Sequence, residues 1–353
     1  MVSALKLMLQ HPTQAANFIY CFVTQLLLVV LHRILLPNYP RYQSLRIEAQ
    51  KAYLSSTALH FPQFTHRLPA DYSERLATPI AGKGWHGYTI SGETPRSIKD
   101  ATNPKSLTVV LYAHGGGYAR GEARMYLWYF KRWIAVAKSK GLDVMFLSVE
   151  YPLSGEASHP AQRSAFLAAY RHLLEMGISA SNIVFMGDSA GGGLSVMSAI
   201  QARKEQLPQP AGSILISPWM DMSLSAYEGG NQAVMSDFLV TANTAVPVMT
   251  NAFLGGFSGT DPDVNPLYQP TELIRSLNPQ LIFVGAAEFA LSDSKHWAQR
   301  CRDAGIKCEL HVAWGQMHVW ALGSSFIEPA LRDKTDARMV DWIIECVHGK
   351  SGQ

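Results

Sequence analysis

A serine between small residues is the first candidate for chemistry. The segment Gly187-Asp188-Ser189-Ala190-Gly191-Gly192 follows an apolar, strand-like run that ends at Met186, and an expected helix comes after it. A serine in such a tight strand-to-helix turn has a strained backbone, so the residues two positions away must be small. Its hydroxyl then points into a cleft, at a helix N-terminus whose dipole favours negative charge. We expect Ser189 to be a nucleophile; the alternative is a glycine-rich turn that carries no chemistry.

A run of glycines suits the stabilisation of an oxyanion. His114-Gly115-Gly116-Gly117-Tyr118 follows another strand-like run, which ends at Tyr112. Successive glycines let backbone N–H groups approach a ligand oxygen without obstruction by side chains. A tetrahedral intermediate of acyl transfer carries its negative charge on such an oxygen. The predicted donors are the backbone amides of Gly116, Gly117 and Ala190.

Three neighbouring residues are expected to support these two motifs. His114 stands directly before the glycines, and we expect it to hold their loop by hydrogen bonding rather than to act as a base. Gly115 and Asp188 complete the motifs around the donors and the serine. A phosphate-binding function of the glycine run is disfavoured, because the run fits neither GxGxxG nor GxxxxGK followed by Ser or Thr.

The serine requires a base, and the base requires a carboxylate that orients it. His318 follows the expected strand 308–313, which suits a loop-borne base. Glu288 stands three residues after the expected strand 281–285. Asp293 is five residues further on, in the expected first turn of the next helix, where an acid also complements the helix dipole. We expect His318 as the base and Glu288 as its acid; a structural histidine and Asp293 as the acid are the alternatives.

The segments between these motifs alternate between strands and helices. Short β-branched or apolar runs predict strands, and apolar residues at helical spacing predict helices. Strands are expected at 85–90, 107–112, 144–149, 183–186, 213–217, 281–285 and 308–313, and helices at 126–140, 162–176, 194–205, 296–304 and 334–347. This alternation predicts an α/β fold with a mostly parallel sheet and helices on both faces. Ligands bind such sheets beyond the carboxyl ends of the strands, where all the motifs stand.

The N-terminal segment is apolar enough for a membrane. No Asp, Glu, Lys or Arg occurs between Lys6 and Arg33, and Pro37 ends any helix. The 22 residues from Ala15 to Leu36 can cross a hydrocarbon core of about 30 Å. We expect residues 1–37 to anchor the protein on a membrane, with the endoplasmic reticulum as one location. A helix packed on a cytoplasmic catalytic domain and a cleaved signal are the alternatives.

Composition restricts the class of partner. The net charge is only +3, 16% of the residues are charged, and no dense run of Lys and Arg occurs, which disfavours nucleic acid. The four cysteines show no CxxC spacing, so we expect reduced thiols rather than a zinc site. The motifs require no metal or cofactor. The expected partner is a small hydrophobic ester. For the oligomeric state, a homodimer is an alternative to a monomer.

Taken together, the motifs resemble the hormone-sensitive-lipase family of α/β-hydrolases. The resemblance runs from about Val109 to Trp342, and its most specific parts are residues 114–117 and 187–192. In that family the acid usually precedes the histidine by about thirty residues. Here 318 − 288 = 30, whereas 318 − 293 = 25, which favours Glu288. The family more often has Asp at this position, and Glu in a Glu-x-x-Leu-x-Asp setting resembles a variant of fungal members.

The resemblance also implies an architecture and an activity. It implies an α/β-hydrolase catalytic domain over residues 38–353, with a helical cap built from about 38–75 and 220–265. It implies a serine esterase, lipase or deacetylase that acts through an acyl-enzyme, and it does not fix the substrate. The apolar N-terminus and the Met- and Phe-rich segment 220–265 favour hydrophobic esters such as acetylated sterols, terpenoids or lipids. The alternatives are an acyltransferase or amidase with the same triad and a non-catalytic small-molecule receptor.

Overall fold

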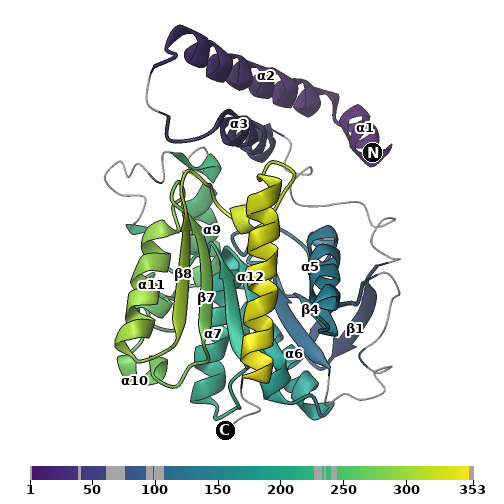
Figure 1. The fold of residues 1–353 in the computed structure, drawn as a ribbon, viewed down its shortest axis with the longest axis vertical. Coiled ribbons are helices and arrows are strands. Elements are labelled where there is room, and N and C mark those ends of the chain that lie inside the picture. The colour runs from purple at the N-terminus through teal and green to yellow at the C-terminus, as the bar shows by residue number, and fades with distance from the viewer. Residues whose placement is uncertain are drawn as a thin grey trace.

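The computed structural model shows one twisted sheet with helices on both faces (Figure 1). The residues that it describes are 2–38, 41–60, 76–92, 98, 107–225, 233, 236–239 and 245–349. The strands are β1 Thr78–Gly82, β2 Trp85–Ile90, β3 Thr108–Ala113, β4 Val144–Glu150, β5 Ile183–Asp188, β6 Gly212–Ile216, β7 Gln280–Gly285 and β8 Cys308–Ala313. The helices are α1 Val2–Gln10, α2 Pro12–Leu35, α3 Leu45–His60, α5 Leu127–Ser139, α6 Ala161–Glu175, α7 Ala190–Lys204, α9 Ala245–Leu254, α10 Thr271–Ile274, α11 Leu291–Asp303 and α12 Pro329–His348.

The strands pair in the order β1-β2-β4-β3-β5-β6-β7-β8. The pairs β1–β2 and β2–β4 are antiparallel, and every pair from β4–β3 to β7–β8 is parallel. The predicted mostly parallel sheet is therefore confirmed. Because the parallel strands end at one edge of the sheet, the loops after β3, β5, β7 and β8 meet there.

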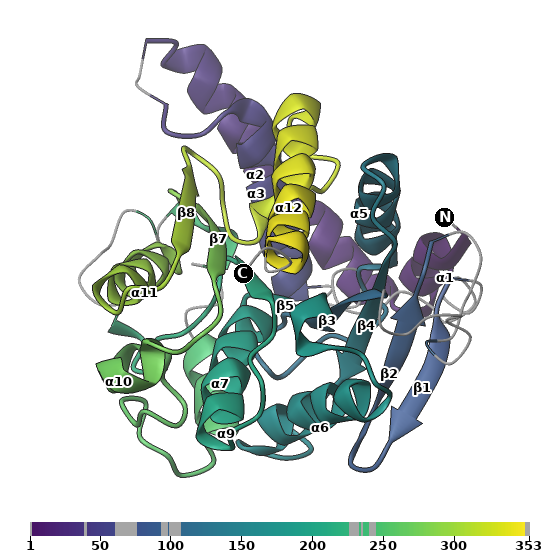
Figure 2. The same cartoon turned by 60° about the horizontal axis from the view of Figure 1, so that its bottom comes forward.

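Alternate residues of the central strands supply two apolar cores. Val109 and Leu111 of β3 lie in the core that α6, α7 and α11 cover. Val110 and Tyr112 of the same strand lie in the core that α5 and α12 cover. The two helix layers are seen on opposite sides of the sheet in Figure 2. The period of two along a strand thus produces the layered α/β architecture.

The sequence pattern misses one strand and starts three helices too late. Strand β1 contains Pro79, which weakens a strand signal but is tolerated because β1 is an edge strand. Helix α7 begins at Ala190 rather than at residue 194, because three successive glycines lower helix propensity. A Cβ on Gly191 would lie 2.0 Å from the carbonyl oxygen of Ala113, so only glycine lets α7 start this close to β3. Helices α11 and α12 also begin earlier than predicted.

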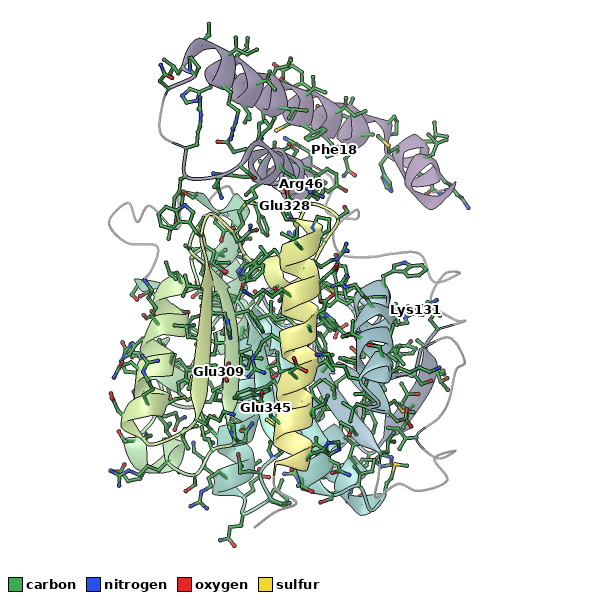
Figure 3. All side chains as sticks on the ribbon, viewed as in Figure 1. Phe18, Arg46, Lys131, Glu309, Glu328 and Glu345 are labelled. Atoms are coloured by element: carbon green, nitrogen blue, oxygen red, sulfur yellow. The ribbon has the colours of Figure 1, made fainter. Side chains whose placement is uncertain are left out.

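The N-terminal helices lie above the carboxyl ends of the strands (Figures 1 and 3). Phe18 and Phe22 of α2 each pack edge-on against Tyr53 of α3, with ring centroids 6.0 Å apart. Arg33 near the end of α2 pairs with Glu48 of α3 at 2.5 Å. These contacts join α2 to α3 through one side of α2.

The segment that includes α3 docks on the catalytic domain. The Tyr42 hydroxyl donates to the carbonyl of Ala286 at 2.5 Å, in the loop after β7. The Gln43 amide donates to the carbonyl of Gly315 at 3.1 Å, in the loop after β8. Figure 3 marks Arg46 of α3 beside Glu328 at the start of α12, with which it forms an ion pair. These segments therefore sit on the loops that carry the expected acid and base.

The second expected cap segment is described only in part. Residues 236–239 and α9 lie within it, and the Ser55 hydroxyl of α3 donates to the carbonyl of Phe238 at 3.4 Å. The two expected cap segments are thus in contact with each other. Residues 39–40, 61–75, 226–232, 234–235 and 240–244 of the expected cap lie outside the described residues.

Candidate active site

Ser189 occupies a strained turn between β5 and α7. Its φ is 51° and its ψ is −122°, a conformation that is rare for a residue with a side chain. Its N–H donates to the carbonyl of Ile216 at 2.9 Å, which fixes the turn against β6. A Cβ on Gly187 would lie 2.3 Å from the carbonyl oxygen of Gly191. The small residues on both sides of Ser189 are therefore a steric requirement of the turn.

The hydroxyl, an imidazole and a carboxylate form one hydrogen-bonded chain. Ser189 Oγ lies 2.8 Å from His318 Nε2, and His318 Nδ1 lies 2.7 Å from Glu288 Oε2. All three side chains are buried. The structure thus brings together the three residues that the sequence singled out from the loops after β5, β7 and β8.

Asp293 is placed elsewhere, in the first turn of α11. One oxygen of its buried carboxylate accepts the N–H groups of Met220 at 3.1 Å and of Asp221 at 2.9 Å. Burial raises the pKa of Asp293 to about 7. Its hydrogen bonds hold the segment after β6, so its position suits a structural role.

Ser217 fixes the carboxylate of Glu288. Its hydroxyl donates to Glu288 Oε1 at 2.7 Å and accepts the N–H of Val319 at 2.9 Å. The N–H of Gly285 also donates to Glu288 Oε1, at 2.5 Å. Ser217 and Val319 both have positive φ, 46° and 55°, so residues with strained backbone lie next to Glu288 and His318. The hydroxyl of Ser217 therefore links the end of β6 to Glu288 and to the loop that carries His318.

The imidazole of His318 is tuned by burial and by its acid. Burial alone lowers the pKa of His318, but the hydrogen bond and charge of Glu288 outweigh it, and the pKa ends above the ordinary 6.5. The ring of Phe289 lies with its centroid 4.8 Å from that of the imidazole. A raised pKa favours the protonated imidazole, so the surroundings of His318 stabilise a positive charge on its ring.

Asp188 ties the glycine loop to the serine. Its carboxylate accepts the N–H of Gly115 at 2.9 Å and the hydroxyls of Tyr112 at 2.7 Å and Tyr126 at 2.8 Å. Burial raises the pKa of Asp188 to about 6, although these three donors favour the ionised form. Because Asp188 adjoins Ser189, the same carboxylate sets the distance between the loop and the serine.

The predicted oxyanion donors belong to this tied loop and to the start of α7. Gly116 and Gly117 have φ of 115° and 62°, which a side chain would strain. Among the described residues, no hydrogen-bond acceptor is found for their amides or for that of Ala190. A Cβ on Gly117 would lie 3.0 Å from the sulfur of Met249, so helix α9, in the second expected cap segment, reaches this loop.

His114 has the supporting geometry that was expected of it. Its Nδ1 lies 2.8 Å from the carbonyl of Gly115, and its own carbonyl accepts the hydroxyl of Tyr151 at 2.6 Å. Burial lowers the pKa of His114 to about 4, so the ring is neutral near pH 7. Its ring stacks on that of Tyr151, with centroids 4.3 Å apart. These contacts hold the loop.

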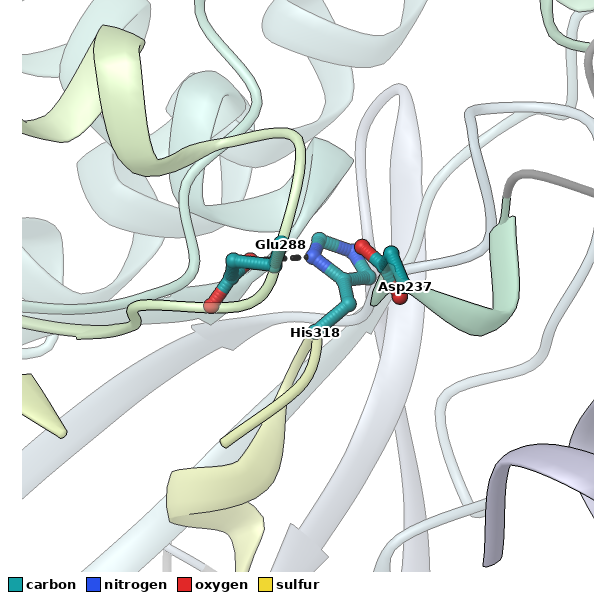
Figure 4. Close-up of side chains that lie close together, drawn as sticks. All are labelled: Asp237, Glu288 and His318. Atoms are coloured by element: carbon teal, nitrogen blue, oxygen red, sulfur yellow. Dashed lines mark hydrogen bonds and ion pairs between the residues drawn. The ribbon is translucent and has the colours of Figure 1, made fainter. Parts of the chain in front are cut away.

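A second acid, Asp237, lies beside the imidazole (Figure 4). One carboxylate oxygen of Asp237, one of Glu288 and one ring nitrogen of His318 all lie within 4.8 Å of one another. Three such groups are a set that a cation could use. Here Glu288 and His318 already bind each other, and Asp237 accepts the N–H of Phe289. We therefore interpret the cluster as an acid–base network rather than a metal centre.

Comparison with known proteins identifies the family. A sequence model of the alpha/beta hydrolase fold matches residues 110–322. The structure resembles that of a hormone-sensitive-lipase homologue, EstE7 from a metagenome library, with a TM-score of 0.69 and 28% sequence identity over 84% of this chain and 97% of that one. The chain is an α/β-hydrolase of the hormone-sensitive-lipase family. A second metagenomic hormone-sensitive lipase has a TM-score of 0.66 and 27% identity, covering 90% of this chain and 96% of its own.

Curated relatives of this hydrolase are ester-cleaving enzymes. An acetyl-hydrolase of Streptomyces hygroscopicus is 33% identical over 214 residues, which are 60% of this chain and 67% of that protein. An esterase of Acinetobacter venetianus is 24% identical over 247 residues, 70% of this chain and 77% of that protein. The chain is thus a serine hydrolase that acts on carboxylic ester bonds. The resemblance to fungal members stays a prediction.

Several residues of the site carry no signal of their own in the sequence. Ser217 stands in the segment Ser-Pro-Trp-Met-Asp at a strand end, but nothing local connects it to Glu288. Tyr112 and Tyr126 act through Asp188, which is 76 and 62 residues away along the chain. Asp237 lies in an irregular segment without periodicity. Only the fold reveals these partners.

Replacing Ser217 with alanine should lower kcat while leaving KM nearly unchanged. The variant removes one hydrogen bond to the buried carboxylate and leaves the N–H of Val319 without its acceptor. A hydrogen bond to a charged group contributes about 1.5–3 kcal/mol, so kcat should fall about tenfold or more. Steady-state ester hydrolysis measures this.

Ser195 provides the matched control. It is also buried, but its hydroxyl donates to the carbonyl of Gly191 within α7. Ser195→Ala should keep kcat within about threefold of the wild type, a change below 1 kcal/mol. Equal losses in the two variants would show that Ser217 has no special role in holding Glu288.

Proposed function

We propose that Ser189, His318 and Glu288 form the catalytic triad of this ester hydrolase. The observation that carries the proposal is the continuous hydrogen-bond chain from Ser189 Oγ through His318 to Glu288, at a strained strand-to-helix turn. The geometry matches the requirement for a nucleophile, a base within hydrogen-bond reach and a group that orients the base.

The mechanism proceeds through an acyl-enzyme. His318 Nε2 takes the proton of Ser189 Oγ as the oxygen attacks the ester carbonyl carbon. Glu288 holds the tautomer with the proton on Nδ1 and stabilises the imidazolium that forms. His318 then gives its proton to the leaving alcohol as the C–O bond breaks. Water attacks the acyl group with His318 again as base, which releases the carboxylic acid and restores Ser189.

The backbone amides of Gly116, Gly117 and Ala190 are the proposed oxyanion donors. They stand on the loop that Asp188 ties to the serine and at the positive end of the helix α7. Donors that are held before the reaction need no reorganisation when the negative charge appears on the carbonyl oxygen. The removal of one such donor typically costs about 3–4 kcal/mol of transition-state stabilisation.

The proposed substrates are hydrophobic esters, such as acetylated sterols, terpenoids or lipids. Apolar side chains surround the reacting groups: Phe289 and Phe238 lie beside the imidazole, and Met249 and Trp219 lie beside Gly117. A relative that is named an acetyl-hydrolase supports a small acyl group. Such surroundings suit an acetyl group on a bulky apolar alcohol.

A series of nitrophenyl esters from acetyl to decanoyl tests this function. We expect hydrolysis that is fastest for short acyl chains and that vanishes in Ser189→Ala. Glu288→Gln should lower kcat by roughly a hundredfold to ten-thousandfold, because the imidazole loses the carboxylate that orients it. Asp293→Asn is the control and should retain most of the activity. Undiminished hydrolysis by Ser189→Ala, or a larger loss in Asp293→Asn than in Glu288→Gln, would contradict the proposed triad.

We also propose that α2 attaches this hydrolase to a membrane. By length and composition, Pro12–Leu35 is the one helix among the described residues that could cross a membrane. The side of α2 that does not face α3 presents exposed apolar side chains, among them Leu27, Leu28 and Leu31. An exposed apolar helix of this size is favourable in a lipid environment and unfavourable in water.

Vesicle sedimentation tests the attachment. The full chain should sediment with phosphatidylcholine vesicles, and the variant L27E/L28E/L31E should stay in the supernatant. Each carboxylate placed in lipid costs roughly a few kcal/mol, so three of them should abolish binding. Tyr268→Glu, at an exposed aromatic residue after α9, is the control and should bind like the wild type. Equal sedimentation of all three proteins would contradict attachment through α2.

A further inference from the structure

Asp237 is a buried acid that the proposed mechanism does not use. It belongs to the segment between β6 and α9, and its side chain is fully buried. A buried carboxylate is unfavourable unless it is paired or hydrogen-bonded. The groups around Asp237 therefore indicate why an acid is present there.

The hydrogen bonds of Asp237 lead to the loop of the triad acid. One carboxylate oxygen accepts the N–H of Phe289 at 3.2 Å, and Phe289 directly follows Glu288. The other oxygen accepts the N–H of Leu239 at 3.4 Å, within its own segment. The carboxylate thus bridges the cap segment and the loop that carries Glu288.

The charged groups around Asp237 come from three elements. Its carboxylate lies in the cluster with His318 and Glu288, and Figure 4 shows it beside the imidazole that Glu288 binds. Lys51 of α3 also interacts with it, because the charge of Asp237 raises the pKa of Lys51 against the lowering by burial. Burial raises the pKa of Asp237 to about 7, while the charge of His318 lowers it and that of Glu288 raises it. The acid therefore shares an electrostatic network with the base.

We propose that Asp237 is a positioning residue for His318, which places a second negative charge beside the imidazole and holds the Glu288 loop through the N–H of Phe289. The proposal rests on the proposed function, in which His318 is the base. The charge stabilises the imidazolium that forms when Ser189 loses its proton. Through the hydrogen bond between Asp237 and the N–H of Phe289, the position of the Glu288 loop depends on how the segment that contains Asp237 packs.

The variant Asp237→Asn separates these two roles. Asparagine keeps an oxygen that can accept the N–H of Phe289, but it removes the negative charge. A charge within about 5 Å shifts a pKa by roughly one unit or more. The pKa of His318 should therefore fall, and the acid limb of the kcat/KM profile should move lower by up to about one pH unit, because Asp237, with a pKa of about 7, is only partly ionised where that limb lies. Since the proton is only partly transferred in the transition state, the maximal kcat should fall less than about tenfold.

Asp293→Asn is the matched control for charge removal. Asp293 is also buried and its pKa is also raised to about 7, but its hydrogen bonds go to the segment after β6 rather than to the loop of Glu288. Its acid limb should coincide with that of the wild type. Asp237→Ala should show the same shift of the limb and a further loss of kcat, because the N–H of Phe289 loses its acceptor. Thermal unfolding of each variant verifies that it is folded.

The outcomes separate this proposal from the triad itself. An unshifted acid limb in folded Asp237→Asn, or an equal shift in Asp293→Asn, would overturn the role of Asp237. His318→Ala tests the proposed function independently and should abolish hydrolysis. If His318→Ala is inactive while Asp237→Asn has the wild-type profile, only the role of Asp237 fails. If His318→Ala keeps full activity, the triad fails as well.

Discussion

The buried carboxylate of Glu288 imposes the main constraint on this structure. A carboxylate that is buried away from water must be stabilised by hydrogen-bond donors that the fold holds around it. Glu288 receives three such donors: the hydroxyl of Ser217 at the end of β6, the N–H of Gly285 at the end of β7 and the imidazole of His318 after β8. The ends of three neighbouring strands must therefore lie side by side at one edge of the sheet. The parallel register of β6, β7 and β8 places them there.

The same edge of the sheet also fixes the other half of the site. Asp188 at the end of β5 draws in Gly115 after β3, and the tyrosines from β3 and from the start of α5 complete its hydrogen bonds. The N-terminal segment then rests on this edge, because Tyr42 and Gln43 bind the loops after β7 and β8. The segment before α3 is thus in direct contact with the loops that carry Glu288 and His318.

The sequence predicts those parts of the site whose steric requirements restrict several consecutive residues. The strained turn of Ser189 requires small neighbours, and the glycine loop requires residues without side chains, so both are visible along the chain. The spacing between Glu288 and His318 also favours the pair that the structure brings together. Strand β1 is missed because Pro79 weakens its signal. The start of α7 is missed because the glycines that let this helix pack close to β3 have a low helix propensity. Ser217 and Asp237 act only through partners that are distant in the sequence, and no local pattern marks them.

Covalent labelling tests the central claim, that Ser189 is the nucleophile which this network activates. A fluorophosphonate probe forms a bond from phosphorus to an activated serine oxygen and releases fluoride. After digestion, mass spectrometry should find the adduct on the peptide that contains Ser189, with labelling proportional to the loss of ester hydrolysis. The adduct should be absent in Ser189→Ala and slow to form in Glu288→Gln. An adduct on another serine, or full hydrolysis by a protein labelled at Ser189, would contradict the account.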